Sequence, residues 1–171
     1  LRCLDETVKG VWEDGWTHHI PRLMVLANVA SLLDVAPREL TDWFWCAYTD
    51  AYDWVVEPNV LGMGTFAAGD VMTTKPYVSG APYLDRMGDH CGPCAFDPRD
   101  DCPLTPLYWA YLARHAETLG EVSRMRLPLA SLRRRDGGRR RADTAVFEVV
   151  RRVLAAGETL TPARLRDEVD G

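Results

Sequence analysis

The sequence has no long apolar run and almost no lysine. No stretch of about eighteen or more apolar residues occurs in its 171 residues, which excludes a membrane-spanning helix, and no secretory signal peptide is visible. We therefore expect a cytoplasmic protein with reduced cysteines. Lys9 and Lys75 are the only lysines, so arginine supplies nearly all of the positive charge. Internal repeats and convincing strand-like alternation are also absent, which predicts an all-α fold.

Size and charge indicate one globular domain with an uneven surface. The 171 residues, 47% of them hydrophobic, suffice for an apolar core. Because the chain begins at Leu1 and not at methionine, we expect it to be the C-terminal part of a longer protein. A net charge of −5 argues against a nucleic-acid partner, but arginines gather near the end of the chain. These are Arg124, Arg126, Arg133, Arg134, Arg135, Arg139, Arg140 and Arg141. For residues 133–141 two interpretations stay open, a solvated linker and a segment that neutralises DNA phosphates.

Three cysteines lie in one short segment, Cys91, Cys94 and Cys102. The gap of two residues between Cys91 and Cys94 lets both thiolates converge on one metal ion or cluster. A four-thiolate site needs Cys3 or Cys46 as well. Cys46 lies among aromatic residues, where cysteine behaves as a small buried hydrophobe, so we predict Cys3 as the fourth ligand. Zinc, an iron-sulfur cluster, and a disulfide between Cys91 and Cys94 all stay open on the cysteine pattern alone.

Apolar spacing and capping signals predict helices over most of the chain. The predicted helices cover residues 5–15, 21–34, 37–54, 81–87, 106–120 and 143–157, with a short last helix from residue 162. Asp5 and Asp143 are their expected N-caps, and Cys3 is expected just before the first turn. Between residues 57 and 70 the periodicity stops, and glycines there allow the close approach of backbone that a ligand cradle uses.

Two adjacent histidines and an aromatic helix are the other candidate features. His18 and His19 stand at the entrance of the second predicted helix. They either begin the helix and face solvent, or act as a general acid beside a ligand, since imidazole exchanges a proton near neutral pH. The third predicted helix carries Trp43, Phe44, Trp45, Tyr48, Tyr52 and Trp54. These rings either form core or provide an electron-hopping route.

Five blocks in residues 1–126 carry a family resemblance. They are Thr17-His18-His19-Ile20-Pro21-Arg22-Leu23-Met24-Val25, Asp50-Ala51-Tyr52-Asp53-Trp54-Val55, Pro58-Asn59-Val60-Leu61-Gly62-Met63, Thr74-Lys75-Pro76-Tyr77-Val78-Ser79 and Cys91-Gly92-Pro93-Cys94. In this order they resemble the iron-sulfur bacterial cryptochromes and photolyases, the prokaryotic (6-4) photolyases. The resemblance implies the C-terminal half of the helical FAD-binding domain. An Arg-rich linker, 127–142, and a helical extension of unknown role, 143–171, would follow.

The resemblance also implies a role for individual residues. It makes Cys3, Cys91, Cys94 and Cys102 ligands of a 4Fe-4S cluster, in preference to zinc. It matches His18 and His19 to a histidine pair at the lesion, with His19 as the proton donor. The implied FAD-pocket residues are Arg22, Asp50, Asn59, Met63 and Lys75. The implied electron-transfer residue is Trp43, and the implied substrate-pocket residues are Tyr77 and Tyr83.

The function implied by the resemblance is that of a DNA photolyase. Reduced FAD would drive repair of (6-4) pyrimidine photoproducts in UV-damaged DNA after absorbing light. An antenna chromophore is expected only in an N-terminal domain outside this chain, and the full-length protein is expected to be a monomer without membrane contact. The alternative is a cryptochrome-type blue-light photoreceptor that uses the same flavin and Trp43 but repairs nothing; the histidine pair favours repair. A third alternative is a small four-cysteine zinc module.

Overall fold

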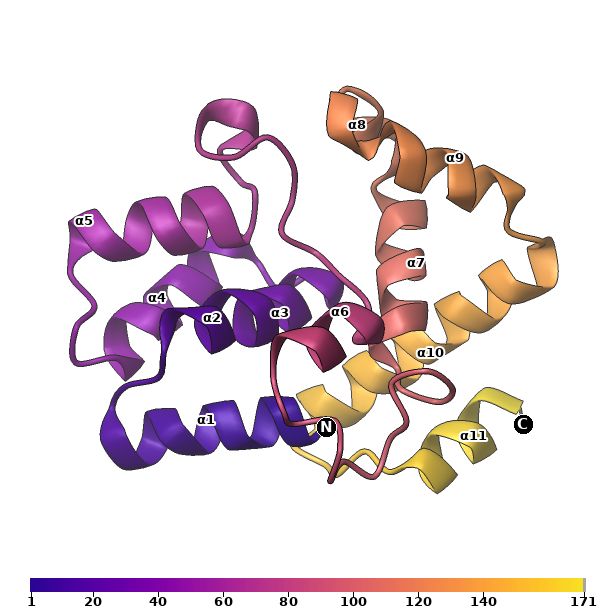
Figure 1. The fold of residues 1–171 in the computed structure, drawn as a ribbon, viewed down its shortest axis with the longest axis horizontal. Coiled ribbons are helices and arrows are strands. Elements are labelled where there is room, and N and C mark those ends of the chain that lie inside the picture. Colours follow the sequence, from indigo (N-terminus) through magenta and orange to yellow (C-terminus); the bar gives the residue numbers. More distant parts are fainter. Residues whose placement is uncertain (171) are drawn as a thin grey trace. The chain divides into compact units, whose positions relative to one another are not determined.

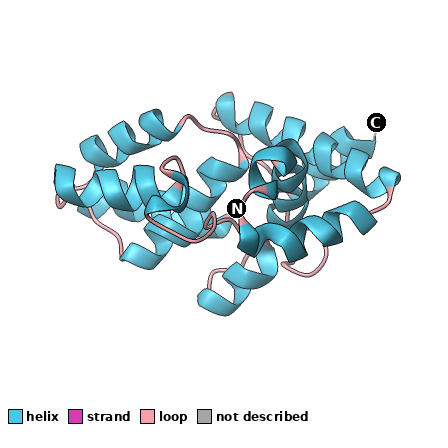
Figure 2. Cartoon of the chain, turned by 90° about the horizontal axis from the view of Figure 1, so that it is seen from above, coloured by secondary structure: helices cyan, strands magenta, loops and turns pink. Residues whose placement is uncertain are grey.

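Helices account for 68% of this computed structural model, which describes residues 1–170. No β-strand occurs within those residues (Figure 2), so the prediction of an all-α fold is confirmed. The chain forms two compact units. One is Cys3–Val78, and the other runs from Ser79 onward and includes Leu1–Arg2. The division into functional regions at residues 126 and 142 stays a prediction.

The first unit is a set of short helices joined by tight turns (Figure 1). In chain order these are α1 (Arg2–Asp14), α2 (His19–Pro21), η1 (Arg22–Ala27), α3 (Asn28–Leu32), α4 (Pro37–Ala47), α5 (Asp53–Val56), η2 (Glu57–Gly64) and η3 (Gly69–Val71). η1 and η2 have π-helical hydrogen bonding, and each continues directly from the α-helix before it. Their core is made of Val11, Leu26, Ala27, Ala30, Leu40, Phe44, Tyr48, Val56 and Val60.

Helical periodicity is missing from the sequence between residues 57 and 70, yet the first part of this stretch, Glu57–Gly64, forms the helix η2. Two glycines explain the difference. A Cβ atom on Gly64 would lie 3.0 Å from Cβ of Ala27, and one on Gly62 would lie 2.7 Å from Cγ of Met72. The two glycines therefore allow the close backbone approach that was expected. The groups that approach them are side chains of Ala27 and Met72 and not a ligand.

The third predicted helix, 37–54, is wrong beyond Ala47. α4 ends there, and Tyr48 has extended backbone angles, φ −107° and ψ 135°. Its ring stacks on Phe44 with centroids 5.1 Å apart, and it is buried. Trp45 and Tyr52 of the same aromatic stretch are 44% and 61% exposed, so these two rings are not part of the core. The Tyr48 hydroxyl also shares a hydrogen bond of 2.8 Å with Thr17, 31 positions earlier, a tertiary contact that aromatic spacing does not reveal.

Two cysteines lie in surroundings different from those expected. α1 begins at Arg2, so Cys3 lies inside the helix and not before it. It is buried with Thr7 and Val11 on one helical face, and the Thr7 hydroxyl donates to the Cys3 carbonyl at 2.7 Å. Cys46, expected to be a buried hydrophobe, is exposed. The buried face of α4 is centred on Leu40 and Phe44, and Cys46 lies on the opposite side.

The second unit packs around two long helices. Its elements are α6 (Ala81–Met87), α7 (Leu104–Arg114), α8 (Ala116–Gly120), η4 (Ser123–Met125), α9 (Arg126–Arg134), α10 (Gly137–Ala155) and α11 (Pro162–Asp170). α10 lies against α7, as Figure 1 shows. The fully buried side chains of these two helices include Leu104, Leu107, Leu112, Val150 and Val153.

The helix predictions in this unit have mixed outcomes. α6 and the helix from residue 162 are confirmed. The helix expected at 106–120 begins at Leu104 and is interrupted at His115. Asp143 is not an N-cap but is buried within α10, which begins six residues earlier with Asp136 as its cap. Among residues 1–170, no helix combines the length and apolarity needed to cross a bilayer.

Candidate functional site

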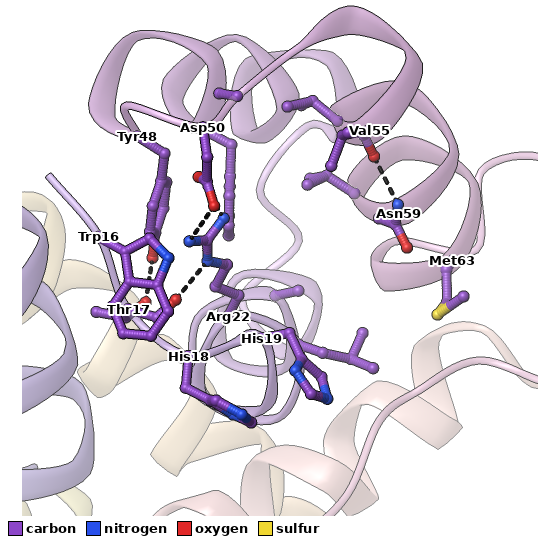
Figure 3. A pocket seen from close by; sticks show the side chains of 16 residues that line it. Trp16, Thr17, His18, His19, Arg22, Tyr48, Asp50, Val55, Asn59 and Met63 are labelled. Carbon is purple, nitrogen blue, oxygen red and sulfur yellow. Dashed lines mark hydrogen bonds and ion pairs between the residues drawn. The ribbon is translucent and has the colours of Figure 1, made fainter.

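The first unit contains a cavity of about 550 Å³ (Figure 3). Its walls come from the turn before α2, from η1, from the end of α4, and from α5 with η2. Most of the lining is apolar, with polar groups on two sides. Sites for small molecules and cofactors typically have volumes of about 300–1,000 Å³ and a similar mixture of apolar walls and few polar groups. The cavity is therefore of a size and composition that suit an organic cofactor.

An ion pair forms one side of the cavity. Arg22 Nη1 and Nη2 donate to the two carboxylate oxygens of Asp50 at 2.8 and 3.0 Å. Arg22 Nε donates to the Thr17 carbonyl at 2.8 Å, so the guanidinium is held on both edges (Figure 3). The hydrogen bonds from Arg22 lower the pKa of the Asp50 carboxyl. The pair thus presents a permanent carboxylate to the cavity at neutral pH.

The aromatic ring of Tyr48 packs against the guanidinium of this ion pair. The Arg22 guanidinium carbon lies 4.0 Å from the centre of the Tyr48 ring, a cation–π contact. The hydroxyls of Tyr48 and Thr17 are 2.8 Å apart and share a hydrogen bond. Burial raises the pKa of Tyr48, and the hydrogen bond with Thr17 opposes that rise. The hydrogen bonds and the Tyr48 ring contact therefore restrict the Arg22 side chain to few orientations.

His18 and His19 both line the cavity. Their ring centroids are 4.2 Å apart, and both side chains are exposed (Figure 3). His18 Nδ1 accepts a hydrogen bond from the backbone N–H of Ile20 at 3.3 Å, so His18 caps α2. His18 thus caps the helix start and both rings are exposed, as the first interpretation expects. Both rings also line the cavity, as the second interpretation, a general acid beside a ligand, requires.

Asn59 and Met63 line the opposite side of the cavity from η2 (Figure 3). Asn59 Nδ2 donates to the Val55 carbonyl at 2.7 Å. This bond orients the side chain and leaves its carbonyl oxygen able to accept from a ligand. The two residues are four apart, which places them on the same side of the helix.

Four other predicted residues do not line the cavity. Lys75 is exposed, and its carbonyl accepts a hydrogen bond from the Thr73 hydroxyl at 2.9 Å. Tyr77 is half-buried in the first unit, and Tyr83 is 37% exposed in the second. Trp43 lies one ring away from the cavity, with edge-to-face contacts to two lining residues. These are Phe44 at 5.3 Å and Tyr48 at 6.1 Å between centroids.

The cysteine segment follows α6 in the second unit. The N–H of Cys94 donates to the carbonyl of Cys91 at 3.1 Å, which closes a tight turn and brings both residues to one hollow of about 430 Å³. Cys102 is buried and does not line that hollow. Burial raises the pKa of the Cys91 thiol, and the charges of Asp85 and Cys94 act in the same direction.

The thiols are all free, so the alternative of a Cys91–Cys94 disulfide is not seen. Within the described part of the chain, no group of three or more His, Cys, Asp or Glu side chains is arranged to hold a metal ion. The structure therefore brings together two of the four predicted ligands, Cys91 and Cys94. The four-cysteine site stays a prediction.

Comparison with known proteins identifies the family. The chain is 38% identical over 136 residues, 77% of its length, to a protein named (6-4) photolyase from Agrobacterium fabrum. The chain belongs to the photolyase/cryptochrome family. It spans 27% of the length of that relative. It is also 36% identical over 66 residues to an uncharacterized protein of Acanthamoeba polyphaga mimivirus, of which it spans 54%. No family model matches the chain.

Thr17, Tyr48 and Trp16 also line the cavity of this family member but were not among the predicted site residues. Thr17 stands in the same block as the histidines, and its carbonyl and hydroxyl both serve the Arg22 cluster. Tyr48 belongs to the aromatic stretch that was assigned to core or electron transfer. Its contact with Arg22, 26 positions earlier, is a tertiary contact. The only feature of the sequence that indicates a place for Tyr48 in the site is its position two residues before Asp50.

Arg22→Ala is expected to lower the free energy of unfolding of the chain by about 2 kcal/mol. The variant loses three hydrogen bonds and the Tyr48 contact, but Asp50 is 45% exposed, so water replaces part of the loss. Arg22→Lys keeps the positive charge but loses the two parallel hydrogen bonds of the guanidinium. Its free energy of unfolding should therefore lie between those of the wild type and Arg22→Ala. Urea unfolding followed by circular dichroism measures both.

The same comparison at low pH tests the ion pair. Because the pKa of folded Asp50 is lowered, its contribution is present above the ordinary aspartate pKa of about 4 and is lost as the pH falls through the lowered value. The gap between the wild type and Arg22→Ala should therefore shrink in acid. An equal gap at neutral and at strongly acidic pH would show that Arg22 acts through packing alone.

Proposed function

We propose that the chain supplies part of the flavin and lesion site of a (6-4) photolyase, which repairs (6-4) pyrimidine photoproducts in DNA by light-driven electron transfer from reduced FAD. The observation that carries the proposal is the cavity of Figure 3, where the histidine pair, the Arg22–Asp50 pair and Asn59 converge. The name of the Agrobacterium relative supports the same reaction.

The hydrogen-bond acceptors around the cavity suit a flavin. Asp50 offers a carboxylate and Asn59 a carbonyl oxygen, and both can accept from the N–H or hydroxyl groups of such a cofactor. The apolar lining between them, including Val56 and Val60, suits the flat ring system. We propose that Arg22, Asp50, Asn59 and Met63 hold FAD. Lys75, which is exposed, is proposed to contact it from outside this cavity.

When bound, reduced FAD supplies an electron to the photoproduct after it absorbs light. This chain contributes the proton: His19, exposed beside the cavity, is proposed to donate to the lesion as general acid. The damaged bases must leave the duplex to reach it. Tyr77 and Tyr83 are proposed to contact the lesion. His18, tied to the start of α2, holds its neighbour in place.

Trp43 is proposed to carry electrons toward the cavity. It is half-buried, and its ring contacts Phe44 and Tyr48, which line the cavity. These contacts form a continuous aromatic path from the helix α4 to the site. The Arg22 cation over Tyr48 disfavours a positive charge on that ring, so the path through Phe44 lies in the less cationic surroundings.

We also propose that Cys3, Cys91, Cys94 and Cys102 hold a 4Fe-4S cluster. Thiolates are the ligands that such clusters take, and the turn at Cys91 and Cys94 provides half of the set. The full protein is proposed to be a cytoplasmic monomer that acts on UV-damaged DNA. An antenna chromophore would belong to another part of it.

A chimera tests this proposal. The matching residues of this chain are placed in the Agrobacterium (6-4) photolyase in place of its own, and the flavin absorbance and light-dependent repair of a (6-4) oligonucleotide are measured. Bound flavin with repair is the expected result. Bound flavin without repair favours the photoreceptor alternative, and a folded chimera that retains no flavin contradicts the proposal.

A further inference from the structure

The corner between α9 and α10 of the second unit (Figure 1) lies in an arginine-rich part of the sequence. Between residues 124 and 141 the sequence has eight arginines and a single acidic residue, Asp136. This density stands out in a chain of net charge −5. The proposed flavin and lesion site lies in the other unit and does not use it.

Three of the arginines hold the corner in shape. Arg135 forms a bidentate pair with Asp143, at 2.5 and 2.8 Å, and its guanidinium lies 4.9 Å from the centre of the Trp109 ring on α7. Asp143 is 5% exposed, so this pair is fixed in the interior. Arg140 donates to the carbonyls of Leu132 and Arg133 at the end of α9. Arg139 pairs with Asp136, the cap of α10.

The other five arginines have no acidic partner among the described residues and are exposed: Arg124, Arg126, Arg133, Arg134 and Arg141. Arg126 and Arg133 are seven residues apart on α9, two turns, so they lie on one side at a spacing of about 10 Å. The Arg141 guanidinium lies 3.5 Å from the position of a Cβ on Gly137, so it folds back to the corner. Arg133, Arg134 and Arg141 lie at the corner, and Arg124 and Arg126 lie at the other end of α9. Unpaired like charges near one another repel, and a polyanion relieves that repulsion.

We propose that this arginine corner binds the phosphate backbone of duplex DNA without reading its sequence. Guanidinium groups bind phosphate oxygens bidentately, and a row of them matches the closely spaced phosphates of a strand. An anionic membrane fits less well. α9 buries Leu129 and Leu132 in the core and exposes only Leu127, so it lacks the apolar face that inserts into lipid.

The test uses the chain itself, without flavin, lesion or light, so its outcome is independent of the proposed repair. Binding to an undamaged, fluorescent duplex is measured by anisotropy between 50 and 200 mM salt. The corner variant is Arg133→Gln, Arg134→Gln, Arg141→Gln. The matched control is Arg86→Gln, Arg151→Gln, Arg166→Gln, three exposed arginines of the same unit that remove the same charge.

The corner variant should bind more weakly at low salt and lose much of its salt dependence. Removing three phosphate contacts lowers the slope of log K against log salt by about 2.7, so the affinity lost over this fourfold salt range shrinks by roughly 40-fold. The control variant should resemble the wild type. Lysine at the three corner positions keeps the charge and should restore most of the binding, which a purely structural role would not predict.

Two results overturn the inference. One is equal weakening in the corner and control variants, which would show an effect of net charge alone. The other is a corner variant that binds DNA normally but loses binding to vesicles containing phosphatidylserine. If the glutamine variant does not fold, DNA binding by the lysine variant is the test. A folded lysine variant that keeps the three positive charges but binds no DNA contradicts the proposal.

Discussion

His19→Ala should reduce the rate of (6-4) repair by about 10²–10⁴-fold in the chimeric photolyase while leaving its flavin content unchanged. This is the range over which a positioned general acid accelerates a reaction. His19 lines the cavity with an exposed ring, so it can meet a base that has been turned out of the duplex. Its removal exposes no buried group and should leave the fold intact.

His18→Ala provides the comparison. His18 accepts the N–H of Ile20 at the start of α2, so its loss should cost about 1 kcal/mol of stability, as expected for a helix cap. Its effect on repair should be smaller than that of His19→Ala. A pH profile of repair separates the roles: the loss of a proton donor changes the profile, whereas the loss of a cap leaves it unchanged. The opposite ranking would transfer the proton donor to His18.

Cys102→Ala should eliminate nearly all of the protein-bound iron and the broad visible absorption of a 4Fe-4S cluster. A cluster that loses one of four thiolates is exposed to water and to oxidation. Cys102 is buried, so alanine there leaves a small cavity, and circular dichroism has to show that the variant is folded. Anaerobic purification followed by iron and sulfide analysis measures the result, in the chain and in the chimera.

Cys46→Ala is the matched control, because Cys46 is exposed on α4 and is not in the proposed ligand set. It should keep full iron content. Zinc in place of iron in the wild type would favour the zinc-module alternative. Iron that persists in Cys102→Ala but disappears in Cys46→Ala would replace Cys102 by Cys46 in the ligand set.

Capping residues, prolines and glycines were sufficient to predict helix ends that depend only on neighbouring residues. Ala81–Met87 begins with a proline in its first turn and ends before Gly88, and its predicted bounds are confirmed. The helix from Pro162 follows Thr161, whose hydroxyl accepts the N–H of Arg164 at 3.2 Å. The block from Thr17 to Arg22 likewise holds, within six residues, two groups that form the ion-pair side of the cavity: the Arg22 guanidinium and the Thr17 carbonyl that accepts from it.

The sequence by itself determined the all-α class, the family and six of the residues that line the cavity, His18, His19, Arg22, Asp50, Asn59 and Met63, since periodicity and ordered motifs are written along the chain. Only the tertiary structure decided that Tyr48 leaves its helix to meet Thr17, and that residues 57–64 are helical. It likewise decided that Cys46 is exposed and Asp143 buried. These outcomes depend on partners from distant parts of the chain, and the free energy of those contacts exceeds local propensity.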